Sequence, residues 1–267
     1  MNADTQAVAA EPLLLRADEG GVVTLTLNRP AQFNSLSQAL MSELQAELDR
    51  IAADERVRVV IMAGAGKAFC AGHDLKEMRS DPGKEFQKQL FRQCSKLMLT
   101  LVRLPQPVIA RVHGIATAAG CQLVSMCDLA VSADSARFAV SGVNLGLFCT
   151  TPSVGLARNL GRKQAMEMLL TGDFIDAQTA LARGLVNRVV PPDQLDAEIA
   201  KLTASILAKT PVAIKLGKQA FYRQLELGLE QAYELASETM ACNMMAEDAQ
   251  EGIDAFVAKR KPEWKGR

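Results

Sequence analysis

The sequence predicts an α/β fold that carries a helical C-terminal region. Short apolar or β-branched runs alternate with amphipathic helical segments as far as Pro191 and Pro192. Beyond these two prolines, residues 193–258 have helical character throughout and no strand signal. We therefore expect three parts, which are a mobile leader over residues 1–14, a β/α core over 15–192 and a helical region over 193–267.

The elements of the core follow from local patterns. Strands are expected where apolar runs end at Gly, Pro or Asp, over residues 21–30, 57–66, 107–114, 128–134 and 137–140. Helices are expected where apolar residues recur every three or four positions, over residues 35–54, 161–173 and 176–186, and after the strand that ends near Gly114. Ser37 is the expected N-cap of the first helix, and Gly184 the glycine that ends the last one.

Composition excludes several classes of function. With 30 basic and 30 acidic residues, the chain has no bulk charge for nucleic acid or a membrane surface. Its six cysteines form no CxxC and only two histidines are present, so we expect no metal site. The apolar runs are too short to span a bilayer. The N-terminus has no Arg before Arg16 and resembles no targeting peptide, so we predict a cytoplasmic protein.

Two segments rich in Gly and Ala each follow a predicted strand, GAGKAFCAGHDL at 64–75 and GIATAAGCQLVSMCD at 114–128. The first is not a phosphate-binding P-loop, because Ala68 follows Lys67 where that motif needs Ser or Thr. Small residues let backbone N–H groups approach a ligand, and the second segment opens a helix whose first N–H groups have no internal partner. Together the two turns are suited to hold an oxygen that gains negative charge. His73, between them, is a base, a ligand or a turn residue.

Five segments then identify a family resemblance by their order along the chain. They are LNRPAQFNSLS, GKAFCAGHDLKEM, PQPVIARVHGIATAAGCQLVSMCDLAVSADSARFA, LTGDFIDAQTALARGLVNRVV and FVAKRKPEW. Together they resemble the enoyl-CoA hydratase/isomerase (crotonase) superfamily over residues 15–264, and TAAGCQL with VNLGLFCTTPSVGLAR indicates one branch of it. The resemblance implies a ClpP-like β-β-α spiral core with a C-terminal helical oligomerisation region. It also implies an acyl-CoA or enoyl-CoA ligand, with coenzyme A as part of the substrate and no permanently bound cofactor.

The resemblance also implies roles for particular residues. The backbone N–H groups of His73 and Ala119 correspond to the family's oxyanion hole. Gln122 and Gly142 stand where the family's hydratases carry two glutamates, and Gln122 can orient a water but has no titratable proton. Cys149 and Thr150 lie near a further acid/base position used by some isomerases. For coenzyme A, the resemblance points to Arg29, Ala31, Phe33, Lys67, Ala71, Asp74, Leu75 and Lys259.

Three functions follow from these residues, and the sequence leaves them open. The first is an enzyme that processes acyl-CoA thioesters through an enolate-like state, with efficient hydration in doubt. The second is a weak or inactive CoA-thioester binding or regulatory protein. The third is another crotonase reaction, such as thioester hydrolysis or isomerisation.

The resemblance further implies a homotrimer or a dimer of trimers. A helically spaced apolar stripe in the C-terminal region either packs on the chain's own core or forms a contact between subunits. It consists of Leu225, Leu229, Ala232, Leu235, Ala236 and Met240.

Overall fold

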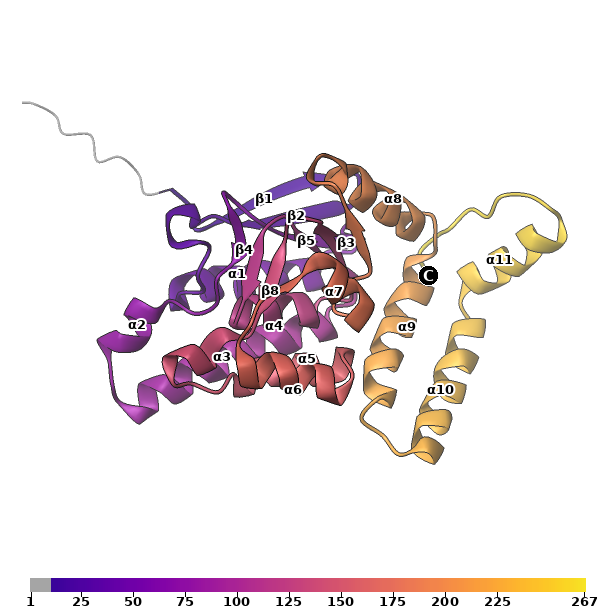
Figure 1. The fold of residues 1–267 in the computed structure, drawn as a ribbon. Helices are drawn as coiled ribbons and strands as arrows, with labels where there is room; N and C mark the ends of the chain where they lie inside the picture. The colour runs from indigo at the N-terminus through magenta and orange to yellow at the C-terminus, as the bar shows by residue number, and fades with distance from the viewer. Residues whose placement is uncertain (1–10) are drawn as a thin grey trace, which may run out of the picture.

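Two mixed β-sheets form the centre of the molecule in the computed structural model, which describes residues 11–267 (Figure 1). The first sheet has the order β1-β2-β3-β5-β7-β10, with β1 (Leu14–Glu19), β2 (Val22–Leu27), β3 (Val59–Gly64), β5 (Val108–Val112), β7 (Leu129–Ala133) and β10 (Arg188–Val190). The second has the order β4-β6-β8-β9, with β4 (Ala68–Cys70), β6 (Ile115–Thr117), β8 (Arg137–Ala139) and β9 (Ile175–Asp176). Among the strands of residues 11–267, only the pairs β1·β2 and β8·β9 are antiparallel.

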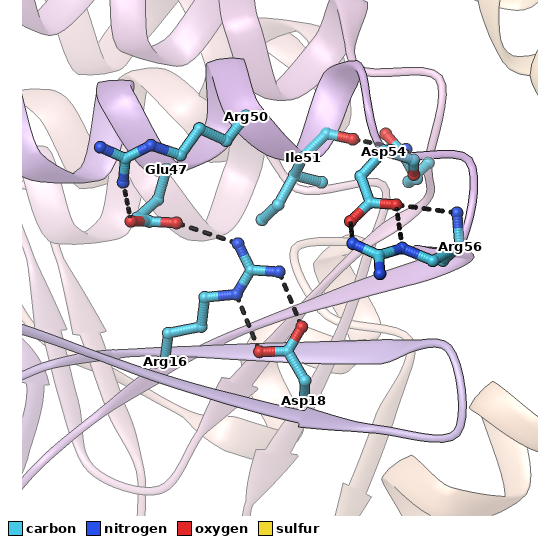
Figure 2. Close-up of polar contacts among 8 residues, drawn as sticks. Arg16, Asp18, Glu47, Arg50, Ile51, Asp54 and Arg56 are labelled. Carbon is cyan, nitrogen blue, oxygen red and sulfur yellow. Dashed lines mark hydrogen bonds and ion pairs between the residues drawn. The ribbon is translucent and has the colours of Figure 1, made fainter.

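The first strand begins within the segment expected to be a leader. Residues 1–10 of that segment lie outside the described residues, but Leu14 already belongs to β1 and pairs with Leu27 of β2. The side chains of β1 are exposed along almost the whole strand, so its sequence lacks the alternation of apolar and polar residues that marks a strand with one buried face. Arg16 pairs with Asp18 of the same strand at 2.7 Å, and its pairing with Glu47 at 3.0 Å ties the strand to helix α1 (Gln38–Ala52) (Figure 2). Such surface pairs each contribute at most about 1 kcal/mol.

Helices cover the sheets and end at the expected signals. The other helices of the core are α2 (Leu75–Ser80), α3 (Lys84–Arg103), α4 (Ala119–Met126), α5 (Thr150–Asn159), α6 (Arg162–Thr171) and α7 (Ala177–Arg183), with 3-10 turns η1 (Pro30–Gln32), η2 (Ser141–Leu145) and η3 (Pro192–Gln194). The Ser37 hydroxyl caps α1 by accepting from the Leu40 amide at 3.2 Å, and Gly184 ends α7 at a φ of 85°. Both signals were therefore interpreted correctly.

The longest helix, α3, was not predicted. Its buried residues are Leu90, Cys94, Leu97, Met98 and Leu101, and their helical spacing was a readable signal in the sequence. This helix packs against α1 and α4, so it is part of the same hydrophobic core.

The C-terminal region is helical, as expected. It consists of α8 (Leu195–Leu207), α9 (Pro211–Gln224), α10 (Leu229–Met244) and α11 (Glu247–Val257), and α9 and α10 lie side by side away from the sheets (Figure 1). A buried ion pair docks α9 on the core, because the Lys218 Nζ donates to Asp128 at 2.6 Å and to the carbonyl oxygens of Leu101 and Gln106 at 2.9 Å. Among the described residues, no helix combines the length and apolar character needed to cross a membrane.

Three side chains of the apolar stripe in the C-terminal helices do not pack on the chain's own core, whereas Ala232 and Leu235 are half-buried. Leu225 is 56% exposed, Leu229 77% and Met240 61%. Of the two alternatives for this stripe, packing within the subunit is therefore wrong for these three side chains.

Candidate active site

The two Gly/Ala turns meet because the strands before them are neighbours. Strands β4 and β6 are paired in parallel, so their carboxyl ends lie at one edge of the second sheet. Gly72, at a φ of +94°, directly faces the start of α4. A Cβ atom at Gly72 would lie 2.9 Å from the Cβ of Ala118 and 3.3 Å from the amide nitrogen of Ala119. The expected convergence of the two turns is thus present in the fold.

The Gly/Ala composition of the second turn has two separate causes. A Cβ atom at Gly120 would lie only 2.0 Å from the carbonyl oxygen of Cys70, so helix α4 can pack on β4 only with glycine there. Ala118 has φ 50° and ψ −119°, a backbone conformation normally kept for glycine. This conformation turns the chain into α4, whose first N–H group belongs to Ala119. The small residues of the second turn therefore serve in part to let α4 approach the backbone of β4, and not only to let a ligand approach.

Gln122 lies one helical turn after Ala119 on α4. Its side chain is 4% exposed, and its amide oxygen Oε1 has no hydrogen-bond partner in residues 11–267. A buried polar atom without a partner costs about 1–3 kcal/mol of folding free energy. Folding stability therefore does not account for an amide at this position.

Gly142 is buried in η2, and its surroundings leave no room for a side chain. A Cβ atom there would lie 2.5 Å from the Leu147 carbonyl oxygen and 2.7 Å from the Cys149 sulfur. Its φ is not in the left-handed region, so space and not backbone strain forbids a larger residue. Beside it, the hydroxyls of Thr117 and Ser141 lie 3.0 Å apart and link β6 to η2, a contact that sequence patterns did not indicate.

None of the remaining acid/base candidates provides a charged group at neutral pH. Cys149 is buried at the N-cap of α5, and burial raises the pKa of its thiol, which disfavours the thiolate nucleophile. Thr150, the first residue of α5, is exposed. Burial lowers the pKa of His73 to about 4, so its imidazole is neutral at neutral pH. The His73 ring packs edge-on against Phe91, with the ring centroids 5.5 Å apart.

Comparison with known proteins identifies the family. A model of the enoyl-CoA hydratase/isomerase family matches residues 17–267. The chain belongs to this family. It is 46% identical over 253 residues to enoyl-CoA hydratase domain-containing protein 3, mitochondrial, of Xenopus laevis, covering 95% of this chain and 86% of that protein.

Solved structures of the family superpose closely on this chain. The crystal structure of an enoyl-CoA hydratase of Mycobacterium smegmatis is 60% identical, with a TM-score of 0.94 and coverage of 95% of this chain and 99% of that one. The human enoyl-CoA hydratase domain-containing protein 3 is 43% identical, with a TM-score of 0.92 and coverage of 95% and 100%. The predicted crotonase fold and the branch indicated by TAAGCQL are confirmed, and the chain is an acyl-CoA-processing enzyme of the family.

The prediction of a cytoplasmic location is wrong. The Xenopus laevis relative is named as a mitochondrial protein. The prediction rested on the composition of the first residues alone, and composition does not determine the compartment of a protein.

Most of the residues implied for coenzyme A lie together in the fold. Arg29 and Asp74 pair at 2.8 Å across η1 and α2, and Asp74 also caps α2. Burial raises the pKa of the Asp74 carboxyl, but hydrogen bonds from Arg29 and the helix amides outweigh it and hold that pKa below its usual value. The Ala71 amide donates to the Phe33 carbonyl oxygen at 3.0 Å, which brings the exposed side chain of Phe33 to the same region.

The other coenzyme A candidates differ in position. Ala31, in η1, and Leu75, at the start of α2, are exposed beside the Arg29–Asp74 pair, and Lys67 is exposed just before β4. Lys259 follows α11, which lies at the opposite side of the molecule from α2 (Figure 1). Within one subunit, the fold therefore does not bring Lys259 to the other candidates. Residues 11–267 contain no group of three or more His, Cys, Asp or Glu side chains arranged to hold a metal.

Proposed function

We propose that the chain binds an acyl-CoA or enoyl-CoA thioester and polarises its carbonyl between the backbone amides of His73 and Ala119. The observation that supports this proposal is the approach of Gly72 to the start of α4, where a Cβ atom at Gly72 would lie 3.3 Å from the amide nitrogen of Ala119. Neither amide donates a hydrogen bond to another group in residues 11–267. Ala119 is the first residue of α4, where the helix dipole adds partial positive charge. These donors would stabilise an enolate-like oxygen.

Hydration by this site is expected to be slow. Acid and base side chains each contribute about 10²- to 10⁴-fold to such reactions. Gln122 cannot ionise, and Gly142 has neither a side chain nor space for one. These two positions favour a second candidate function, that of a catalytically weak CoA-thioester binding or regulatory protein. Isomerisation or thioester hydrolysis would need another base, and the raised pKa of Cys149 argues against that thiol.

The assembly is proposed to be a homotrimer, or a dimer of trimers. The exposed apolar side chains of Leu225, Leu229 and Met240 support this proposal, because single subunits seldom leave such a patch in water. Lys259 would then be available to the phosphates of coenzyme A bound to a neighbouring subunit.

One substitution tests the oxyanion role without requiring turnover. Proline is tolerated at the first position of a helix, so Ala119→Pro deletes one N–H donor while α4 is retained. We expect weaker binding of butyryl-CoA by calorimetry, and unchanged binding of the S-butyl thioether analogue, which has no carbonyl. If the chain turns over crotonyl-CoA, the rate should fall about 10²- to 10³-fold.

A matched variant controls for the effect of proline itself. Lys84→Pro places proline at the first position of α3, on the surface, and should change neither affinity. Melting curves of both variants establish that they fold. Equal loss of thioester and thioether binding in Ala119→Pro would contradict the oxyanion role, and a native chain that binds neither compound would contradict the proposed function as a whole.

A further inference from the structure

A cavity lies at the seam between the core and the C-terminal helices. It has a volume of about 530 Å³, which is within the usual range for small-molecule sites. Its walls come from the end of α1, the segments before β3 and β5, the start of α9 and the C-terminal tail. The tail closes this side, because Gly266 approaches Pro211 and the chain ends beside the start of α9 (Figure 1).

This cavity is separate from the proposed thioester site. Arg58 and Pro107 line it, and they precede β3 and β5, whereas the two Gly/Ala turns follow the carboxyl ends of neighbouring parallel strands. Strand β3 has six residues, which corresponds to about 20 Å at the rise of a β-strand. A molecule in the cavity therefore does not contact His73 or Ala119.

The lining combines apolar walls with positive charge. Val57, Pro105, Val212, Ile214 and Trp264 provide apolar surface. Arg58, Lys215 and Lys265 also line the cavity, and Glu55 is the one acidic residue among its lining residues. This composition matches a molecule that has an apolar body and an anionic head.

Arg58 provides a specific point of recognition for an anion. Its Nη2 atom donates to the Lys209 carbonyl oxygen at 2.7 Å, and no carboxylate of residues 11–267 forms an ion pair with the guanidinium. Burial lowers the pKa of Arg58, and the distant charge of Asp248 only partly opposes this. A partly buried guanidinium without a counter-ion gains from a bound carboxylate, which its planar donor group fits.

The cavity wall also contains a group that folding leaves unsatisfied. Gln106 lines the cavity and is 7% exposed. Its Nε2 donates to the Ile51 carbonyl oxygen at 2.8 Å, but its Oε1 has no partner in residues 11–267. An amide oxygen needs a donor, which an ionised carboxylate does not have, so Gln106 takes no part in binding the anion.

We propose that this cavity binds a small amphipathic carboxylate, such as a medium-chain fatty acid, with its carboxylate on Arg58 and its chain against Trp264 and Val212. The ligand would contact both the core and α9. It would therefore strengthen the docking of the C-terminal helices on the core.

The chain contains a built-in probe for this proposal. Trp264 is the only tryptophan of the protein and lines this cavity, so its fluorescence reports on this site and not on the thioester site. Titration with sodium octanoate should change the Trp264 emission to saturation and raise the melting temperature. Octan-1-ol, which has the same chain without the charge, should bind at least about tenfold more weakly. Saturating butyryl-CoA should not displace octanoate.

Two variants and two controls complete the test. Arg58→Gln should weaken octanoate binding about tenfold or more, and Lys215→Gln should weaken it in the same direction without removing a hydrogen bond that the fold uses. The controls Arg162→Gln and Lys163→Gln, exposed on α6, should leave binding unchanged. Three results would each overturn the proposal, namely an emission change that does not saturate, equal binding of octanol, or octanoate affinity unchanged in both cavity variants. Emission that follows protein concentration and not octanoate would show instead that another subunit fills the cavity.

Discussion

Replacing Ala118 by glycine should stabilise the protein. Ala118 is held at φ 50° and ψ −119°, where an L-residue with a Cβ atom is strained. Glycine adopts this conformation without strain, so Ala118→Gly removes the penalty and leaves the path of the chain into α4 unchanged.

The magnitude follows from two opposing terms. A residue in a sparsely populated backbone region costs about 1–3 kcal/mol. Glycine gives the unfolded chain more freedom, which costs about 0.4–1 kcal/mol. The net gain is therefore up to about 2.6 kcal/mol, and about 1.3 kcal/mol from the middle of each range. For a chain of this size, 1 kcal/mol corresponds to roughly 2–4 °C in the melting temperature.

The assay is thermal and urea unfolding at one fixed protein concentration, which removes the effect of oligomerisation on stability. Ala53→Gly is the matched control, because Ala53 is exposed and has an ordinary φ of −95°. It should lower stability by about 0.4–1 kcal/mol. A loss of stability in Ala118→Gly as large as that of the control would refute the inference that Ala118 is strained.

Three further predictions concern the site and the assembly. Gly142→Ala should lower the melting temperature, because its Cβ would meet the Leu147 carbonyl oxygen. Gln122→Glu should fold and should raise the rate of crotonyl-CoA hydration, because it adds an ionisable group. A larger gain in rate from Gly142→Glu than from Gln122→Glu would contradict the assignment of Gln122 and Gly142 to the two glutamate positions. Because the pKa of His73 falls from 6.5 to about 4 on folding, the unfolded chain binds more protons between these values. Stability should therefore fall as the pH drops from 6.5 to 4, by up to about 3 kcal/mol, and urea unfolding of His73→Leu should show a smaller fall. Light scattering should report a trimer or hexamer that Leu229→Asp dissociates, and a native monomer at micromolar concentration would exclude this assembly.

Local patterns in the sequence were sufficient for much of the fold. The apolar face of α1, its cap at Ser37 and the glycine that ends α7 are properties of a few neighbouring residues, and they appear in the structure as predicted. Strand β1 escaped prediction because its pairing with β2 and the Arg16–Glu47 contact, and not a buried face, hold it in place. Helix α3 has the apolar periodicity of a helix with one buried face, so the sequence contained the signal for it although it was not predicted.

The site divides in the same way between sequence and tertiary structure. The sequence by itself determined that two Gly/Ala turns each follow a strand, and that Gln122 and Gly142 provide no ionisable group. Only the tertiary structure decided that Gly120 packs on the Cys70 carbonyl oxygen and that the Leu147 carbonyl oxygen closes the space beside Gly142. It also decided that Arg58 and Trp264, more than 200 positions apart in the sequence, line one cavity. Spacing along the chain encodes a helix face or a turn, whereas burial, strain and shared cavities depend on contacts between segments that no local pattern contains.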